Sequence, residues 1–397
     1  MDQNRTIVFS LACAVCVLFA CFANAQLETQ TKPKLAPIDN DVLNADQWKQ
    51  VDQSVERALA WLASQQQADG SFLSIESGQP AVTGFGLMAF LAKGESPTDG
   101  RYSKTLTRAI DFIVSEQKKN GLIAALAADA SPISRSRVHA NVFASNAISY
   151  NHAISALALS EAYGQCDGAQ AKKLSEVIEK AIAATVEMHN WKVRRPLEKG
   201  GWKYIVDDEN VDGSDLSATA WQVMFLRSAK NAGFDVPKEN IDRAMAFVER
   251  CYSKETGVFV YNPYYQITES RAMAGAGIVA MAHGGRHHTE KAQKSGDWIL
   301  TRDFTKFNAD KSINNLDWQP DRYVYGTFHC TQAMYQLGGK HWKEFYPPVV
   351  ETLLANQKDD GSWPPEKYDK QYGNCYSTSL CILSLSVPNQ MLPIFQR

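Results

Sequence analysis

The sequence has no excess of charge of either sign, and it has few cysteines. Lysine and arginine total 41, aspartate and glutamate total 43, and the net charge is −2. Such a balance gives no electrostatic attraction to nucleic acid or to an anionic membrane, so we expect neither as a partner. Three of the eight cysteines precede residue 25. The remaining five are odd in number and scattered, which excludes a disulfide framework.

One long hydrophobic run, at 6–22, follows a single basic residue and ends at Ala23-Asn24-Ala25. This pattern predicts a signal peptide over 1–25 with cleavage near Ala25, hence a secreted or periplasmic protein with no membrane span after cleavage. The alternative is an uncleaved anchor, because the run is nearly long enough to cross a bilayer. Residues 26–45 are polar and contain proline, so we expect a flexible segment before one domain over 46–397.

A glycine-centred turn recurs along the chain. Residues 66–72 and 357–363 both read Q-x-x-D-G-S-aromatic, and 117–121 keeps the glutamine and the glycine in the same register. Further turn glycines stand at Gly200 and Gly257. The interval from Gly257 to the last turn is about twice the repeat length, so we place a degenerate sixth copy near 317–318. A fixed repeat of this kind indicates a repeat architecture.

Two kinds of helix alternate between these turns. One kind is amphipathic, as over 51–62, and predicts an outer helix. The other is apolar nearly all round and rich in small residues, and a helix without a polar face is buried on every side. The buried stretches are 83–93, 150–163, 215–229, 270–283, 323–337 and 376–387.

Six hairpins of this composition predict an all-α fold, an α6/α6 toroid in which an outer ring of helices surrounds an inner one. The inner helices then run parallel, with their N-termini on one face. An open solenoid explains the repeats equally well, but its terminal repeats need polar caps. The first and last copies of the turn are the most regular ones, and this favours closure.

At these residues the chain resembles the squalene cyclase and protein prenyltransferase repeat superfamily, whose fold is the terpenoid cyclase-like α/α toroid. The Q-x-x-D-G-S-aromatic turns look like the QW motifs of that family, in which the glutamine packs on the aromatic ring and tethers the neighbouring outer helix. Stretches at 150–164, 200–204 and 376–380 are similar to secreted bacterial proteins with prenyltransferase/squalene oxidase repeats. The resemblance implies an isoprenoid-like ligand.

The catalytic residues of that superfamily are not matched. Cyclases protonate an alkene with the middle acid of D-x-D-D-T-A, and the matching stretch 215–220 has Ser217 at the donor position. A serine hydroxyl is too weak an acid for that step. The transferase zinc ligands align with Tyr325, Thr327 and Gly373, which are not ligands of the required kind. We therefore expect neither a metal nor a cofactor.

The polar residues in the first turns of the inner helices are the candidate site residues. Helix N-termini gathered at one mouth attract anions. Arg271 and Asp215 either bind an anion or pair with each other, and the histidines are either acid/base groups or partners of neighbouring helices. The catalytic candidates are Asp215, His152 and His329. The ligand-binding candidates are Tyr150, Ser217, Trp221, Arg271, Tyr325 and Tyr376.

The aromatic residues leave two alternatives open. They either line an apolar cavity or form ordinary core between the rings, and aromatic content alone does not separate the two. The residues concerned are Phe85, Phe90, Trp221, Phe225 and Phe328.

Three further segments carry hypotheses. Residues 208–215 copy the front of a calcium loop but lack its terminal glutamate, and a solvated acidic turn is the alternative. Residues 283–288 contain three histidines, which either bind metal or form an exposed loop. Residues 122–149 are too long for a simple connection, and we expect a lid over the mouth.

These patterns favour a secreted binding toroid that holds an apolar isoprenoid-like ligand or a peptide in its mouth. A divergent terpenoid cyclase or prenyltransferase is the first alternative, and a polysaccharide lyase is the second. The ligand, any turnover and the oligomeric state stay open, because one fold hosts many functions.

Overall fold

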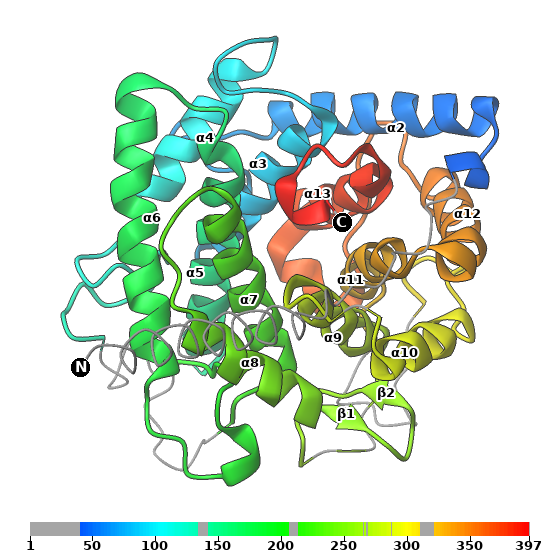
Figure 1. Ribbon diagram of the computed structural model, residues 1–397. Helices are drawn as coiled ribbons and strands as arrows, with labels where there is room; N and C mark the ends of the chain where they lie inside the picture. The colour runs from blue at the N-terminus through cyan, green and yellow to red at the C-terminus, as the bar shows by residue number, and fades with distance from the viewer. Residues whose placement is uncertain are drawn as a thin grey trace, which may run out of the picture. The chain divides into compact units, whose positions relative to one another are not determined.

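The computed structural model describes residues 40–133, 142–205, 213–264, 266, 269–286, 288–309 and 321–396. The predicted signal peptide lies outside these residues. The described residues belong to one compact unit, and helices make up most of it (Figure 1). Two strands of two residues each, β1 (Tyr252–Ser253) and β2 (Val258–Phe259), pair antiparallel in the turn after the helix that ends at Arg250.

Twelve α-helices lie in the described residues and alternate between two kinds. The amphipathic helices are α2 (Ala45–Ser64), α4 (Ser103–Ser115), α6 (Gly168–His189), α8 (Lys238–Arg250), α10 (Glu290–Leu300) and α12 (Gly339–Ala355). The apolar helices are α3 (Ala81–Lys93), α5 (Val142–Tyr163), α7 (Leu216–Asn231), α9 (Arg271–His283), α11 (Tyr323–Leu337) and α13 (Gly373–Ser386). Short 3₁₀ turns are η1 (Asn40–Val42), η2 (Glu76–Gly78), η3 (Pro196–Glu198), η5 (Lys367–Tyr372), η6 (Val387–Asn389) and η7 (Pro393–Phe395).

The apolar helices form a closed inner ring. Each packs against the next one in chain order, from α3 through α5, α7, α9 and α11 to α13, and α13 packs against α3. In the outer ring α12 packs against α2, so both rings close between the last hairpin and the first (Figure 1). The all-α α6/α6 toroid is confirmed, and the open solenoid is excluded.

Small residues allow the inner helices to approach closely. A Cβ atom added to Gly275 of α9 would lie 2.7 Å from the amide nitrogen of Cys330 in α11. The neighbouring Gly277 holds the ring of Phe259 in the same way, with an added Cβ only 2.2 Å from the ring. A larger side chain at Gly275 would push α9 and α11 apart, and one at Gly277 would displace Phe259 of β2, because interiors are close-packed.

Three of the recurring turns use a glutamine to bond the next outer helix. The Gln66 side chain donates to the carbonyl of Thr105 in α4 at 2.8 Å, and Gln117 donates to Val177 in α6 at 2.8 Å. Gln357 donates to Ser54 in α2 at 2.9 Å. The last of these bonds joins the end of the outer ring to its beginning.

His189 takes the place of the glutamine in the third turn. Its Nε2 bonds the carbonyl of Gly200 at 2.8 Å, and its Nδ1 bonds the amide of Asn240 in α8 at 2.7 Å. The imidazole also stacks on Trp202, with ring centroids 3.9 Å apart. The sequence did not reveal that His189 replaces the glutamine. Histidine and glutamine are chemically different residues, and their equivalence follows only from the hydrogen bonds that they make. The sixth copy, expected near 317–318, lies outside the described residues.

The loop expected over 122–149 is wrong at its C-terminal end, whereas the described residues 122–133 are irregular as expected. Helix α5 begins at Val142, eight residues before the predicted start at Tyr150. On the other side, Ile123 and Ala124 are fully buried, and the amide of Ile133 bonds Glu187 of α6 at 2.8 Å. The two ends of the described stretch 122–133 are therefore anchored to the body, while residues 128–132 are exposed. Residues 134–141 lie outside the described residues, so the lid over the mouth stays a prediction.

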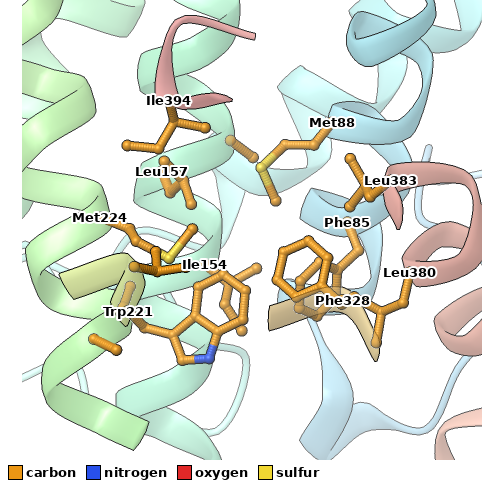
Figure 2. Close-up of a cluster of buried hydrophobic side chains, with 14 of the residues drawn as sticks. Phe85, Met88, Ile154, Leu157, Trp221, Met224, Phe328, Leu380, Leu383 and Ile394 are labelled. Carbon is orange, nitrogen blue, oxygen red and sulfur yellow. The ribbon is translucent and has the colours of Figure 1, made fainter. Parts of the chain in front are cut away.

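Side chains fill the centre of the toroid (Figure 2). Trp221 and Phe328 stack with ring centroids 5.6 Å apart, and Phe85 meets Trp221 edge-on at 5.5 Å. Next to them, on the side away from the start of the inner helices, the side chains of four inner helices and η7 converge: Met88, Leu157, Met224, Leu383 and Ile394. Phe90 packs on Phe72 and Tyr102, and Phe225 packs on His152. The apolar centre is therefore packed core, and its upper surface is formed by Phe85 and Trp221.

Candidate functional site

A cavity of about 600 Å³ opens where the inner helices begin. All six inner helices contribute residues from their N-terminal halves, and η2 and η5 add more. Phe85, Ile154 and Trp221 line it from the packed centre, and tyrosines form much of its wall. The volume is in the range of pockets for small organic molecules.

Five of the six predicted ligand-binding residues line this cavity. They come from four different inner helices: Tyr150, Ser217, Trp221, Tyr325 and Tyr376. The parallel arrangement of those helices explains the convergence, since each residue lies in the first half of its helix. That these side chains bind a ligand stays a prediction.

Arg271 lies away from the cavity. Its Nε donates to Asp321 Oδ2 at 2.6 Å and its Nη2 donates to the Asp321 carbonyl at 3.0 Å. The rings of Phe304 and Tyr323 flank the guanidinium, each 5.2 Å from it. The proposed pairing of Arg271 with Asp215 is therefore wrong, while binding of an anion by Arg271 stays a prediction. Arg271 is the first residue of α9, and its side chain turns toward the segments before α11 instead of toward the mouth.

The two candidate histidines are buried outside the cavity. The Ile123 amide donates to His152 Nδ1 at 3.2 Å, and His152 Nε2 bonds the Thr185 hydroxyl at 2.9 Å. His329 packs against the rings of Trp221 and Tyr325, and neither of its ring nitrogens has a hydrogen-bond partner among the described residues. Burial lowers the pKa of both histidines to about 3. Both imidazoles are therefore neutral at physiological pH, which favours structural roles.

A continuous chain of hydroxyl groups forms one wall of the cavity. The Tyr261 and Tyr204 hydroxyls are 2.6 Å apart, and Tyr204 and Tyr150 are 3.0 Å apart. Tyr150 donates to Ser217 Oγ at 3.1 Å, and Ser217 lies 2.9 Å from the Tyr325 hydroxyl. All five side chains line the cavity. The indole nitrogen of Trp221 ends the chain by donating to Tyr325 at 2.8 Å.

Asp215 lies at the other end of this chain. Its Oδ1 accepts from the Ala218 amide at 2.8 Å and so caps α7. No group among the described residues reaches its Oδ2 at ordinary hydrogen-bond distance. Burial raises the pKa of the Asp215 carboxyl to about 7, although the Ala218 amide and the Tyr204 and Tyr261 hydroxyls lower it in part. Asp215 therefore changes charge near neutral pH, unlike an ordinary aspartate.

An arginine and two acidic residues on the opposite side escaped the sequence analysis. Arg322 lines the cavity and pairs with Asp369, while Glu366 accepts from the Tyr323 amide at 2.6 Å. Burial, followed by the Coulombic effect of Asp369, raises the pKa of Glu366 to about 8. Glu366 and Asp369 lie at η5, in an irregular segment with no periodic pattern. A cluster of two acids within four residues, close before an apolar helix, was the available signal.

The hypotheses about metal sites have little support. The described residues contain no group of three or more histidine, cysteine, aspartate or glutamate side chains placed to hold a metal. Residues 208–212 of the calcium-like loop lie outside them, and so does His287. The described end of that loop, Asp215, is occupied as the cap of α7.

No helix in the described part of the chain is both long and apolar enough to cross a bilayer.

Known structures share this fold. No family model matches the sequence. A variant of the type II terpene cyclase MstE from Scytonema, in complex with geranylgeranyl dihydroxybenzoate, is similar with a TM-score of 0.56 and 15% identity over 88% of this chain and 100% of that one. A D-mannose isomerase has a TM-score of 0.59 and 12% identity over 87% of this chain and 100% of that one. A glycosidase variant has a TM-score of 0.57 and 9% identity over 88% of this chain and 100% of that one.

These identities establish the fold alone. The chain is similar to α/α toroids whose names indicate unlike substrates, so the likeness does not single out the squalene cyclase repeat branch within them. The function has to be argued from the cavity itself.

Proposed function

We propose that the protein binds a small organic molecule in the mouth cavity, one that combines a ring or short hydrocarbon part with several oxygen atoms. The observation that carries this is the composition of the wall. Aromatic rings face the same space as five linked hydroxyls and the guanidinium of Arg322. Aromatic faces bind apolar surface, and the hydroxyls supply both donors and acceptors.

A long isoprenoid chain along the toroid axis is a poorer fit. Phe85, Trp221 and Phe328 fill the axis below the cavity, and Ile394 of η7 closes the far side. Displacing packed core side chains would cost several kcal/mol, on the scale of about 2 to 5 kcal/mol for each large residue lost from a core. The ligand of the MstE complex carries a hydroxylated ring besides its chain. In this chain the cavity favours such an oxygenated part.

A polysaccharide lyase and an alkene-protonating cyclase both fit the mouth less well. The lyase hypothesis depends on Arg271, which is held by Asp321. Alkene protonation lacks an acid at Ser217, whose hydroxyl is part of the linked wall. The names of the mannose isomerase and the glycosidase keep sugars among the candidate ligands, and a sugar presents both an apolar face and hydroxyls.

Fluorescence titration of the mature protein tests the proposal, because Trp221 lines the cavity. The compounds are 4-nitrophenol, 2,4-dihydroxybenzoate, D-mannose and methyl glucoside, with farnesol as the apolar comparison. We expect saturable quenching by at least one oxygenated compound, and about tenfold weaker binding in Tyr325→Phe, which corresponds to one lost hydrogen bond.

Tyr163→Phe is the matched control. Tyr163 lines a separate groove beside α6 and the turn between α7 and α8, so its hydroxyl cannot contact a ligand in the mouth. Saturable binding of farnesol alone, unaffected by Tyr325→Phe, would show that the site is apolar and would contradict the proposal.

A further inference from the structure

Arg322 is the one charged residue among the described residues that line the mouth cavity. The rest of that lining consists of aromatic, aliphatic and neutral polar side chains. Burial raises the pKa of the wall tyrosines above the usual value, as it does for Tyr150, Tyr325 and Tyr376. These hydroxyls are uncharged near neutral pH, so the described wall of the cavity presents a single charge, and that charge is positive.

Most of the hydrogen-bond donors of this guanidinium are left for a ligand. Arginine has five N–H donors in a planar fork. Among the described residues, Asp369 is the hydrogen-bond partner of the Arg322 side chain, and it takes a proton of Nη1. The Asp369 side chain is 1% exposed, whereas that of Arg322 is 43% exposed. Asp369 therefore holds the guanidinium from the protein side and leaves its other donors accessible from the cavity.

The backbone on both sides of Arg322 is fixed. The carbonyl of the preceding Asp321 accepts from Arg271 Nη2 at 3.0 Å. The amide of the following Tyr323 donates to Glu366 Oε2 at 2.6 Å. Arg322 itself is the N-cap residue of α11. The side chain is thus positioned before a ligand arrives, which reduces the entropy that binding would cost.

The helix ends around the mouth add to the attraction for an anion. Four inner helices that begin there, α3, α9, α11 and α13, have no acidic residue in their first turns. The N-terminal end of a helix carries a partial positive charge. Glu366 does not offset this charge near neutral pH, because burial raises its pKa to about 8. Asp369 offsets Arg322 in part, but it lies behind the guanidinium, and an anion in the cavity meets the positive side of the pair first.

We propose that Arg322 is a carboxylate-binding residue of the mouth, and that the ligand is a cyclic or aromatic acid with one negative charge. The inference rests on the proposed ligand site and names the charge of its ligand. A carboxylate matches the planar edge of a guanidinium with two parallel hydrogen bonds. A phosphate monoester carries about 1.5 to 2 negative charges near pH 7. Its second charge would lack a partner, because one cation lines the described wall.

The rest of such an acid fits the neighbouring residues. Arg322 and Tyr325 are three positions apart at the start of α11, so they lie on the same face of the helix, and both line the cavity. Phe85 and Trp221 form the apolar surface next to them. A ring whose carboxylate binds Arg322 can therefore pack on these aromatic side chains and exchange hydrogen bonds with the Tyr325 hydroxyl.

A matched pair of ligands tests the charge. The acid 2,4-dihydroxybenzoate and its neutral amide, 2,4-dihydroxybenzamide, have nearly the same shape, and calorimetric titration near pH 7 measures their binding to the full chain. We expect the acid to bind about 10- to 100-fold more tightly, which is the scale of a hydrogen bond to a charged group. Arg322→Gln should abolish this preference and leave the affinity for the amide unchanged. Arg322→Lys keeps the charge without the fork and should retain part of the preference.

Two further variants keep the test sharp. Arg322→Gln leaves Asp369 buried without its partner, so the double variant Arg322→Gln/Asp369→Asn removes both charges and should lose the preference in the same way. Arg286→Gln is the matched control. Arg286 pairs with Glu249 and follows the C-terminal end of α9, at the opposite end of the inner helix from the mouth. Its loss should change neither affinity.

The outcomes separate this subsite from the proposed ligand site. Equal affinities for acid and amide, or a preference that persists in folded Arg322→Gln, would overturn the subsite, while weaker binding of both in Tyr325→Phe would still support the mouth as a ligand site. If the acid binds through Arg322 and none of the neutral oxygenated compounds binds, the subsite stands and the broader ligand class is wrong. Failure of the acid to bind the wild type would contradict the subsite. Tighter binding of phenyl phosphate than of benzoate would contradict the assignment to a carboxylate.

Discussion

At the scale of single residues, two effects on the pKa of Asp215 oppose each other. Its Oδ1 caps α7 through the Ala218 amide, while burial favours the neutral carboxyl and raises its pKa to about 7. The carboxyl lies close to the Tyr204 and Tyr261 hydroxyls, which line the cavity. Perturbed carboxyls of this kind gather at functional sites, which is why Asp215 stands out among the catalytic candidates.

Asp215→Asn should change the pH dependence of stability. The folded pKa of about 7 lies above the ordinary value of 3.8, so the folded state holds the proton more tightly than the unfolded chain. The contribution of Asp215 to stability is therefore greatest below about pH 4 and is lost as the pH rises through about 7. Asparagine cannot ionise, so the variant should gain stability relative to the wild type across this window.

The gain should reach a few kcal/mol, at about 1.4 kcal/mol per pKa unit. Urea unfolding of both proteins at several pH values between about 4 and 8 measures it. Parallel stability curves for the two proteins would show that Asp215 titrates normally in the fold.

His329→Phe tests the structural interpretation of that histidine. Both imidazole nitrogens are buried without partners in the described part of the chain, and the ring lies against Trp221, Tyr325 and Phe328. Removing unsatisfied polar atoms offsets the cost of changing shape, so we expect unfolding free energies within about 1 kcal/mol of each other near pH 7.

The two proteins should then diverge in acid. The folded pKa of His329, about 3, lies below the ordinary value of 6.5, so the wild type loses stability as the pH falls from about 6.5 and the variant does not. Loss of ligand binding in a folded His329→Phe protein would instead assign the histidine to the site.

At the scale of the elements, four of the described turns have a glycine that touches the next outer helix. Gly121 has φ of +87°, and an added Cβ would lie 2.3 Å from the carbonyl oxygen of Lys180 in α6. Gly70 and Gly200 meet Arg108 of α4 and Arg243 of α8 in the same manner. What repeats is thus a close backbone contact between the turn glycine and the next outer helix. The hydrogen bond of the glutamine, or of His189, orients the turn against that helix.

Gly121→Ala should destabilise the protein by about 2 to 4 kcal/mol. The left-handed backbone costs about 1 to 2 kcal/mol for alanine, and the clash with Lys180 adds a similar amount. Thermal and urea unfolding measure the loss. Gly164→Ala is the control, because an added Cβ there meets nothing within 4 Å. Equal effects of the two substitutions would contradict the backbone-contact argument.

At the scale of the whole toroid, closure depends on the junction between the last and first hairpins. Gln357 bonds the carbonyl and the hydroxyl of Ser54, at 2.9 and 2.8 Å, and also contacts Arg57. α13 packs against α3 inside this junction. A closed ring has no free end, so every inner helix is covered on both sides by others.

Gln357→Ala should loosen this junction. We expect a loss of about 1 to 3 kcal/mol and faster amide hydrogen exchange in α2 and α12, because buried backbone groups of Ser54 lose their partner. Gln66→Ala removes the equivalent bond between α2 and α4 and serves as the comparison. Its effect on exchange should be confined to that neighbourhood. Unchanged exchange in α12 after Gln357→Ala would show that helix packing alone closes the ring.

The sequence by itself determined the helices and favoured their closure into two rings, which the contacts between the last and first hairpins confirmed. Helix type follows from local periodicity, and turn position follows from glycine and glutamine at fixed offsets, as in residues 66–72 and 357–363. Five residues of the mouth were also predictable, because parallel inner helices bring their first turns together. The N-terminal boundary of α5 and the equivalence of His189 to glutamine were not, since neither depends on a local pattern.

Only the tertiary structure decided what those residues do together. Arg271 paired with Asp321 rather than Asp215 because side-chain direction on a helix depends on its rotation in the ring. Arg322, which lines the mouth, pairs with Asp369 of an irregular segment, and Glu366 of the same segment bonds the Tyr323 amide. The hydroxyl chain spans Ser217, Tyr150 and Tyr325 from three helices, and its partners Tyr204 and Tyr261 come from turns. Distances of this kind depend on how separate elements pack, and composition carries no information about them.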